Sequence, residues 1–594
     1  MTASLGNLES LAIYGSFGRL RQACVRHRVA LGWIVVCLLV NALLHCYGGE
    51  DDKYITFWAA RSLAEHGQIL NYNGEHLEQS SSLGFVVLLA LLYKVLPLSM
   101  PAVGYLASMS LFAVTLMLAV SILKRSGVEP HAWVVPAIGS VMNYGYWATS
   151  GMENTFVTAT ELWMVLALTR IIEHWNRRRL WWALLATLAF VSSRPESPII
   201  AIGVVLGVAT SAILVCRNSK QFFVDLGGCW RVAGVVVVAV GLLVGFRLVY
   251  FHAWVPNPAQ LKSGGFDAKN GADQLWSAFL TNGPHLLATY VVALIAIAAS
   301  LVRGVVVKRP VVMLACVAFG HLAFVVQSGG DWMGGFRFLS FAIPSLLLTS
   351  FLVNYRWLAR AGSVAALALA NLICGIQMMR TGTEPRVQLW NALVLKDTIT
   401  KRIKRGNFSP VEYGNRVHMR DTVTIARLMP VLERIVAASP GRPIWIMTGQ
   451  AGIMPYKVMS HYFGRVKLQD LWSLTSRDLY DCFPKGSIVS GAAGSGIAVE
   501  SALRQLQDHG SQCGIPMPDV YYNEGLTSDM RNVLERYGYL LIYEQGGTIH
   551  ASRESTFFPS SVEACGHFAV RRELAARLGI SPLETEDWNH APRR

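Results

Sequence analysis

The sequence predicts a polytopic α-helical membrane protein that carries a soluble α/β domain at its C-terminal end. Of its 594 residues, 53% are hydrophobic and only 15% are charged, and the mean hydropathy of +0.38 is too high for a soluble protein of this length. Apolar runs of nearly membrane-spanning length recur as far as Ile376, after which charged residues and Asn, Gly and Pro turns become frequent. We therefore expect a membrane module over residues 1–378, with a first outer loop at 48–100, and a soluble domain over residues 379–594.

The basic residues indicate a membrane topology rather than nucleic-acid binding. The net charge is +15, but Lys and Arg form short clusters between apolar runs, as cytoplasmic loops do under the positive-inside rule. Basic residues also precede the first run, Val29 to Tyr47, and no small-residue cleavage site follows it. We expect this run to stay as an anchor, with its N-terminal side in the cytoplasm.

Twelve apolar runs are candidates for spans, each near or somewhat below the roughly 20 residues that cross a bilayer as a helix. They are Val29–Tyr47, Leu83–Leu98, Pro101–Leu123, Ala132–Thr149, Thr155–Ile172, Leu180–Val191, Pro198–Val215, Val232–Tyr250, Leu286–Val302, Val311–Val326, Phe338–Val353 and Ala361–Ile376. Leu83–Leu98 is short and contains Lys94, which is typical of a re-entrant or interfacial helix. If it does not cross, all the basic loops fall on the cytoplasmic side. The sequence thus predicts about eleven transmembrane helices and an extracytoplasmic C-terminal domain.

The same topology places five polar motifs on the extracytoplasmic face. They are Glu50–Asp52, Gly151–Glu153, Arg194–Glu196, Pro256–Lys262 and Gly329–Asp331. Acids and cations beside hydrocarbon lose hydration, so they should face water or a polar cleft. We expect these motifs to line one cleft, although each alone reads equally well as an ordinary loop.

The first outer loop combines acids with an amphipathic segment. Tyr54–Glu65 places its apolar residues on one face, which predicts an interfacial helix that Gly67 ends. The alternative is a helix that merely covers the bundle, with Asp51 and Asp52 as its cap and dipole partners. Other polar residues also have a purely structural interpretation. Glu153 fits a first-turn acid, Arg194 a snorkelling cation, and Glu161 within a span a structural hydrogen bond.

The motifs resemble those of the polytopic GT-C glycosyltransferases over most of the chain. The likeness lies in Asp51-Asp52-Lys53-Tyr54-Ile55, Ser150-Gly151-Met152-Glu153, Arg194-Pro195-Glu196, Pro256-Asn257 with Lys262, and Gly330-Asp331-Trp332-Met333 with Phe336-Arg337. Within that superfamily the sequence is most similar to bacterial arabinofuranosyltransferases that use decaprenyl-phosphoryl-arabinose, both the mycobacterial cell-wall enzymes and the pilin-modifying enzyme of pseudomonads. Two departures concern the acceptor side: Lys53 stands where the family usually has a small residue, and Ser82-Leu83-Gly84-Phe85 replaces the more usual turn with proline and tryptophan.

The resemblance implies a transferase in the bacterial inner membrane whose active site and C-terminal domain face the periplasm. The donor would be a polyprenyl-phosphate sugar, and the acceptor a pilin Ser/Thr hydroxyl or a cell-envelope glycan. Such a reaction needs a carboxylate where the acceptor hydroxyl loses its proton, and cations where the phosphate leaves. Asp51 and Asp52 are the catalytic candidates, with Asp51 chosen as base by the resemblance. The candidates for binding the donor phosphate and sugar are Glu153, Arg194, Glu196, Lys262, Asp331 and Arg337. No metal-ligand spacing stands out, although Asp and Glu could bind a divalent cation such as Mg²⁺ or Mn²⁺.

An alternative from another class is a transporter or flippase for a polyprenyl-phosphate sugar. It would use the same outer cations, but it needs a polar path to the cytoplasmic face and often has internal repeats. The sequence shows neither feature.

The C-terminal domain reads as α/β. Pro443–Met447 predicts a strand before a glycine turn, Ile497–Asp508 a helix, and Tyr537–Tyr543 the arm of a hairpin. Gly449–Gly452 lacks the lysine of a phosphate-binding loop, which favours a plain turn. Outside the cytoplasm Cys482 and Cys513 are free to pair as a disulfide.

Overall fold

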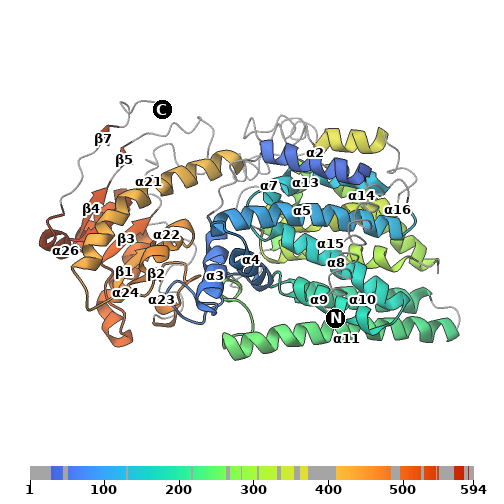
Figure 1. Cartoon of the computed structure of the whole chain (residues 1–594), viewed down its shortest axis with the longest axis horizontal. Helices are drawn as coiled ribbons and strands as arrows, with labels where there is room; N and C mark the ends of the chain where they lie inside the picture. The colour runs from blue at the N-terminus through green and yellow to red at the C-terminus, as the bar shows by residue number, and fades with distance from the viewer. Residues whose placement is uncertain are drawn as a thin grey trace, which may run out of the picture.

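A bundle of helices lies beside an α/β domain in the computed structural model of the chain (Figure 1). The structure describes residues 28–44, 51–128, 131–215, 219–262, 268–282, 284–303, 305, 307–330, 336–353, 362–371, 410–482, 496–523, 528–543, 545–546, 567–580 and 586–587. The bundle consists of α2 (Arg28–Leu44), α4 (Leu83–Val95), α5 (Met100–Arg125), α6 (Val134–Gly139), α7 (Met142–Ala148), α8 (Asn154–Glu173), α9 (Arg177–Val191), α10 (Ser197–Val215), α11 (Ser219–Tyr250), α13 (Ala268–Asn282), α14 (Pro284–Val302), α15 (Arg309–Gln327) and α16 (Arg337–Val353).

Six of the described helices are long and apolar enough to cross a membrane: α5, α8, α10, α11, α14 and α15. Four shorter apolar helices accompany them, at Arg28–Ala42, Leu83–Val95, Arg337–Val353 and Gly362–Asn371. The chain is therefore a multi-pass membrane protein, while the number of about eleven spans stays a prediction. With 13 residues, α4 is about 20 Å long, which is short of the hydrocarbon core of about 30 Å and fits the non-crossing role expected for Leu83–Leu98.

The expected span Ala132–Thr149 is not one continuous helix. A 3₁₀ turn at His131–Trp133 leads into α6 and then α7, and Val141 between the two helices is extended. Asn41 of α2 donates its amide to the carbonyl of Gly139 at this break, so the lost helical hydrogen bond is replaced from a neighbouring helix. Hydropathy alone cannot detect such a break because both pieces are equally apolar.

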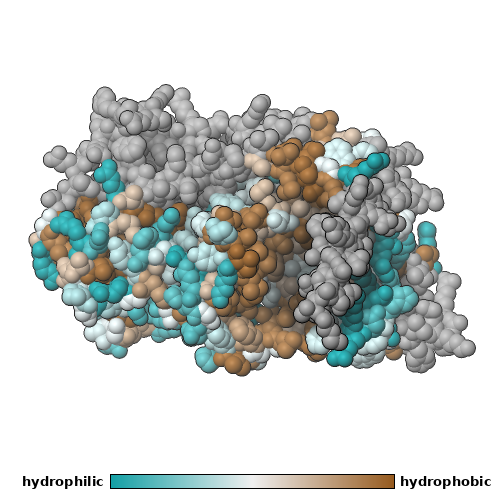
Figure 2. All heavy atoms as spheres, in the orientation of Figure 1, coloured by the Kyte–Doolittle hydropathy of each residue, from teal (hydrophilic) through white to brown (hydrophobic). Residues whose placement is uncertain are grey.

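The surface of the bundle carries the aromatic residues expected near a membrane boundary. Trp175, Trp181 and Trp182 are exposed and flank the arginines that open α9, and Arg231 lies over the Trp175 ring at 5.3 Å. Such a belt of tryptophan and arginine is typical of a membrane–water interface. Figure 2 shows apolar side chains gathered on the bundle next to the α/β domain, whose own surface is more mixed.

The α/β domain is built on a five-stranded sheet with the order β2-β1-β3-β6-β4. Its strands are β1 (Ile444–Thr448), β2 (Val466–Asp470), β3 (Val520–Asn523), β4 (Tyr539–Tyr543) and β6 (His567–Arg571). β1 is parallel to both β2 and β3, whereas β6 is antiparallel to β3 and β4. The helices are α21 (Pro410–Ala437), α22 (Ile453–Tyr462), α23 (Asp478–Cys482), α24 (Gly496–His509), α25 (Ser528–Arg536) and α26 (Arg572–Arg577).

The structure confirms the strand predicted at Pro443–Met447, the helix at Ile497–Asp508 and the Cys482–Cys513 disulfide, whose Cα atoms are 5.8 Å apart. The strand predicted at Tyr537–Tyr543 is present as β4, but it does not form a tight hairpin with the residues that follow it. β4 pairs with β6, far along the chain, and the next residues form β5 (Gln545–Gly546), which pairs in parallel with β7 (Glu586–Asp587). Short apolar strands do not reveal their partners because the pairing depends on tertiary packing.

The helix predicted at Tyr54–Glu65 is α3 (Lys53–His66), which ends at Gly67 with a φ of 70° as a left-handed C-cap. Most of α3 is buried, because it packs on α4 and α5 of the bundle and on α22 of the α/β domain. Trp58 contacts Phe463 on the domain side. The interface that α3 occupies is therefore one between domains, not the lipid surface that its pattern predicts.

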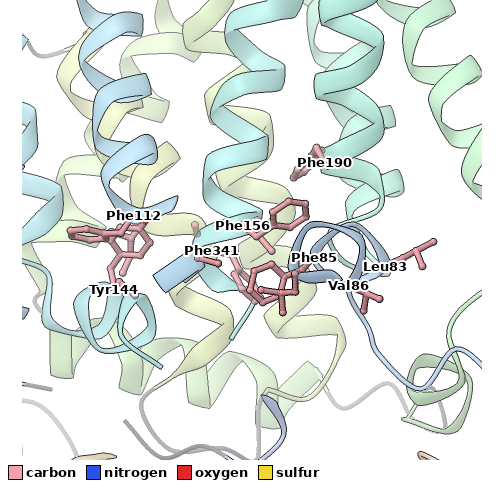
Figure 3. Close-up of a cluster of buried hydrophobic side chains, with 14 of the residues drawn as sticks. Leu83, Phe85, Val86, Phe112, Tyr144, Phe156, Phe190 and Phe341 are labelled. Atoms are coloured by element: carbon pink, nitrogen blue, oxygen red, sulfur yellow. The ribbon is translucent and has the colours of Figure 1, made fainter. Parts of the chain in front are cut away.

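An aromatic core lies beneath the outer loops. Phe85 of α4 faces Phe156 of α8 with their ring centroids 5.6 Å apart, and Phe190 and Phe341 come from α9 and α16 (Figure 3). Each of these helices begins or ends close to one of the polar motifs, so this packing sets where the motifs lie.

Candidate active site

Asp51 and Asp52, at the start of α3, have different partners. Asp52 occupies the N-cap position of α3, but its side chain makes no capping hydrogen bond. Asp52 instead faces Arg337, with 3.7 Å between Oδ2 and Nη1. Asp51 accepts a hydrogen bond at Oδ1 from the backbone amide of Ile453, the first residue of α22. The acid pair therefore joins the bundle on one side to the α/β domain on the other.

Gly452 allows this approach between the domains. A Cβ at this position would collide with both the carboxylate and the carbonyl oxygen of Asp51. Tyr72 of the first outer loop reinforces the contact, because its hydroxyl donates to the carbonyl of Gly452 at 3.3 Å and to that of Tyr54 at 3.2 Å. The turn Gly449–Gly452 thus serves to receive Asp51.

Gly452→Ala is expected to displace Asp51 and to lower transfer activity strongly, because backbone cannot yield as a flexible side chain does. Limited proteolysis should also cleave between bundle and domain faster than in the wild type. Gly441→Ala is the matched control, since a Cβ there meets nothing within 4 Å. Wild-type activity of Gly452→Ala would show that Asp51 is not held in this way.

The motif residues Glu153, Arg194 and Glu196 form one buried charged cluster. Arg194 donates Nη1 to Glu153 Oε1 at 2.7 Å and Nε to Glu196 Oε1 at 3.1 Å. Ser81 accepts a third bond from Arg194 at 3.0 Å. Snorkelling, the alternative interpretation of Arg194, does not hold, since its side chain is buried and paired with anionic partners. Two carboxylates and one guanidinium leave the cluster with a net negative charge.

One carboxylate oxygen of this cluster lacks a protein partner. Glu196 Oε2 is buried and has no hydrogen bond to any residue that the structure describes. A buried acceptor of this kind costs free energy unless a ligand or a water molecule donates to it. The hydroxyl groups of a sugar are suitable donors.

Side-chain amides from two other helices bind the backbone at Arg337, where α16 starts. Asn154 of α8 donates to the carbonyl of Arg337 at 3.4 Å, and Asn143 of α7 donates to the carbonyl of Phe336 at 3.2 Å. Phe336 has a φ of 48°, a strained value for a residue other than glycine. The adjacent Phe338 ring lies 5.1 Å from the Arg337 guanidinium and 5.3 Å from that of Arg194. Two arginines from distant motifs therefore lie close to the same ring.

Lys53 links the motif that contains Asp51 and Asp52 to the motif that contains Glu153. Its buried side chain donates to the Tyr105 hydroxyl at 2.6 Å and to the carbonyl of Ser150 at 3.2 Å. Gly151 follows with a φ of 81°. The residue that departs from the family pattern thus fixes the turn that leads to Glu153.

A buried ion pair that the sequence analysis missed anchors the outer loop to the bundle. Arg247 of α11 binds Glu78 with two bonds of 2.8 Å. Burial raises the pKa of Glu78, while the charge of Arg247 and its hydrogen bonds lower it. Arg247 interrupts an apolar run, and that interruption is the signal that could have marked it.

The Pro256-Asn257 motif serves the same loop. The backbone amide of Asn257 donates to the carbonyl of Glu78 at 3.0 Å. The Asn257 side chain donates to the carbonyl of Ser473 in the α/β domain at 2.7 Å. Asn257 opens the short helix α12 (Asn257–Lys262). The motif therefore acts as a bridge between loop and domain.

Two of the predicted donor-binding residues are not among those whose side chains the structure describes. Asp331 and the side chain of Lys262 lie outside the described residues, as does Glu50. Within the described part of the chain, no group of three or more His, Cys, Asp or Glu residues is arranged to hold a metal ion.

A second polar cluster lies within the membrane bundle. Glu161 of α8 contacts His321 of α15 at 3.0 Å and accepts a bond of 2.7 Å from Ser345 of α16. The expected structural hydrogen bond of Glu161 is confirmed. Its three helices are those that begin or end at the Arg337 and Glu153 motifs, so the cluster ties the supports of the site together.

The comparisons with known proteins find similar backbones among solved structures. No family model and no curated protein matches the chain. A structure of the oligosaccharyltransferase AglB from Archaeoglobus fulgidus, in complex with an inhibitory peptide and a dolichol-phosphate, is 12% identical with a TM-score of 0.42 and covers 83% of this chain and 69% of that chain. The structure of the Archaeoglobus fulgidus oligosaccharyltransferase tethered to an acceptor peptide is 12% identical with a TM-score of 0.45, covering 84% and 70%. Because these TM-scores are below 0.5, the functional proposal rests on the side-chain geometry.

Proposed function

We propose that the chain is a membrane glycosyltransferase of the GT-C type, which moves a sugar from a polyprenyl-phosphate donor to a hydroxyl of an extracytoplasmic acceptor. The observation that carries this proposal is the placement of the adjacent acids Asp51 and Asp52 where the bundle meets the α/β domain, with Asp52 facing Arg337 and Asp51 bonded to the Ile453 amide. A base for a hydroxyl and a cation for a phosphate are then neighbours where a lipid-linked substrate arrives. D-arabinofuranose is the proposed sugar because of the motif resemblance.

The reaction assigns a role to each partner of the acid pair. Asp51, oriented by the Ile453 amide, takes the proton of the acceptor hydroxyl, whose oxygen forms a bond to the anomeric carbon. The bond from that carbon to the phosphate oxygen breaks, and the phosphate leaves with the electron pair. Arg337, positioned by Asp52, stabilises the charge that develops on the phosphate. Lys262 and Asp331 are proposed to assist at the same phosphate and sugar.

The buried Glu153–Arg194–Glu196 cluster is proposed to bind the sugar. A net negative cluster is unsuited to a phosphate, but the free Oε2 of Glu196 can accept a hydroxyl hydrogen bond. Arg194 then holds both carboxylates in place, and Arg337 carries the phosphate role with Lys262.

A donor screen tests this function. Purified protein receives radiolabelled polyprenyl-phosphate pentose, hexose or aminopentose, together with a glycan or a Ser/Thr peptide acceptor. We expect label to reach an acceptor from the pentose donor. No transfer from any of the donors would contradict the proposal.

Arg337→Ala is expected to slow turnover of the lipid donor by roughly ten- to hundred-fold, because a charge-assisted bond to a phosphate contributes about 1.5–3 kcal/mol. Steady-state kinetics over a range of donor concentrations measures this effect. Arg504→Ala, at an exposed arginine of α24, is the control. Equal rates for the two variants would place the phosphate elsewhere.

We also propose that the active site and the α/β domain face the periplasm of a bacterial inner membrane. A reporter fused after Lys124 should then be cytoplasmic, and one fused after Gly264 periplasmic, as alkaline phosphatase and fluorescent-protein fusions distinguish. A periplasmic result at Lys124 would mean that α4 crosses the membrane, and the shared outer site would fail with it.

The flippase alternative requires a polar path through the bundle. The described intramembrane cluster of Glu161, His321 and Ser345 is buried, and its members bond to one another, while His321 Nδ1 has no partner among the described residues. It supports neighbouring helices, so the transferase remains the proposed function.

A further inference from the structure

The carboxyl ends of the parallel strands in the α/β domain face the outer loops of the bundle. The segment after β1 holds Asp51 through Ile453. The segment after β2 receives two side chains from the bundle: Asn257 donates to the carbonyl of Ser473, and Asn71 donates to that of Thr475 at 3.0 Å. One edge of the sheet therefore lies against the proposed active site.

This edge contains the point where the strand order reverses. From β1 the chain passes to β2 on one side and then to β3 on the other. Their helices cover opposite faces, because Ile446 packs in the same core as Met454 of α22, whereas Met447 packs with Leu503 of α24. In open α/β sheets, ligands bind outside the carboxyl ends of the strands at such a switch point.

Trp472 presents a rigid aromatic ring at this edge. The residue is 39% exposed, and in the described part of the α/β domain the other large exposed hydrophobic residue is Ile497 on α24. The Trp472 indole Nε1 donates to the carbonyl of Gly449 at 2.8 Å, and its backbone amide donates to Asp470 at 2.9 Å. The next residue, Ser473, has a φ of 54°. An exposed ring held by two hydrogen bonds next to a strained residue is pre-organised for a ligand.

The surroundings of Trp472 favour a sugar ring over lipid or peptide. A tryptophan of the membrane interface directs its N–H towards water and headgroups, but here the N–H points into the protein. Peptides commonly add a strand to a free sheet edge, but Asn73 bonds both the amide (2.7 Å) and the carbonyl (3.0 Å) of Leu468 on the edge strand β2. Because the N–H is already bonded, the exposed part of the ring offers apolar surface, which suits the C–H face of a saccharide.

We propose that Trp472 is the platform on which the acceptor binds, and that the acceptor is a saccharide. That the bound saccharide is the acceptor rests on the proposed function, whereas the binding of a saccharide to Trp472 does not. Gly449 and Ile453 are four residues apart, which spans at most about 14 Å. The indole therefore lies within about 20 Å of the Asp51 carboxylate, a distance that an oligosaccharide stacked on Trp472 is long enough to span.

Binding is measured without donor, by saturation-transfer NMR on the full chain in nanodiscs. The probes are a methyl-capped arabinofuranosyl disaccharide and a Ser/Thr-containing decapeptide. We expect the disaccharide to bind, Trp472→Ala to weaken it about tenfold, and Trp472→Phe to retain most of the affinity. Trp472→Leu keeps apolar volume without a ring and should weaken binding as the alanine variant does. Ile497→Ala is the matched control and should bind as the wild type does.

Kinetics separates this inference from the proposed function. In transfer assays, Trp472→Ala should raise the KM for the saccharide acceptor and leave kcat and the donor KM unchanged. If the disaccharide binds in a Trp472-dependent way but the protein transfers no sugar, the proposed transferase function is contradicted and the saccharide site is supported. Equal disaccharide affinity in Trp472→Ala and wild type, absence of disaccharide binding, or binding of the peptide alone would overturn the platform.

Discussion

Asp51→Asn is expected to abolish sugar transfer, with a loss of about 10²–10⁴-fold in kcat, which is the usual contribution of a general base. The asparagine side chain keeps an oxygen that accepts the hydrogen bond from Ile453, so the contact between bundle and α/β domain should survive. Only the ability to take a proton is lost. Steady-state transfer with saturating donor and acceptor measures the effect.

The neighbouring acid provides the control. Asp52→Asn should reduce turnover less, because Asp52 acts by positioning Arg337 across 3.7 Å and an amide oxygen still accepts from a guanidinium. Donor binding should be nearly normal in Asp51→Asn. Full activity of Asp51→Asn beside an inactive Asp52→Asn would reverse the two roles, and full activity of both would remove this pair from the mechanism.

Arg194→Ala is expected to destabilise the fold rather than to act only on the rate. The change leaves Glu153 and Glu196 buried without their cation, and removal of one partner from a buried ion pair costs about 3–5 kcal/mol. We expect a lower melting temperature in detergent and poor recovery of folded protein. Differential scanning fluorimetry and size-exclusion chromatography measure both.

A compensating variant tests whether charge is the cause. Arg194→Ala combined with Glu153→Gln and Glu196→Gln removes all three charges and should recover much of the stability, although not the activity. Arg194→Ala with wild-type melting behaviour would show that the two carboxylates are not held as the structure has them.

The sequence predicted those parts of the fold that depend on local pattern. The amphipathic period and Gly67 gave the limits of α3, and a β-branched run before a glycine turn gave β1. The broken segment at Ala132–Thr149 could not be distinguished from a span, because hydropathy does not register that Asn41 of another helix replaces a backbone bond. The partner of β4 was also missed, since strand pairing depends on distant residues.

The candidate site was predicted in composition but not in pairing. The positive-inside rule predicted that the motifs lie on one face of the membrane. In the structure, contacts of Lys53, Asn154, Arg194 and Arg337 link four of the motifs. The partner of Asp51 is a backbone amide some 400 positions away, which has no sequence signature. The Glu78–Arg247 pair was equally hidden, because its residues come from a loop and a helix that only the fold brings together.

The most direct test of the central claim separates transfer from transport in one vesicle experiment. Proteoliposomes carry the labelled polyprenyl-phosphate pentose and are given a water-soluble acceptor outside, with wild type and Asp51→Asn compared. We expect the wild type to move label from lipid to acceptor and Asp51→Asn to leave the label in the lipid. Label that crosses the bilayer while still attached to lipid, at equal rates in both proteins and without reaching the acceptor, would contradict a glycosyltransferase and favour a flippase.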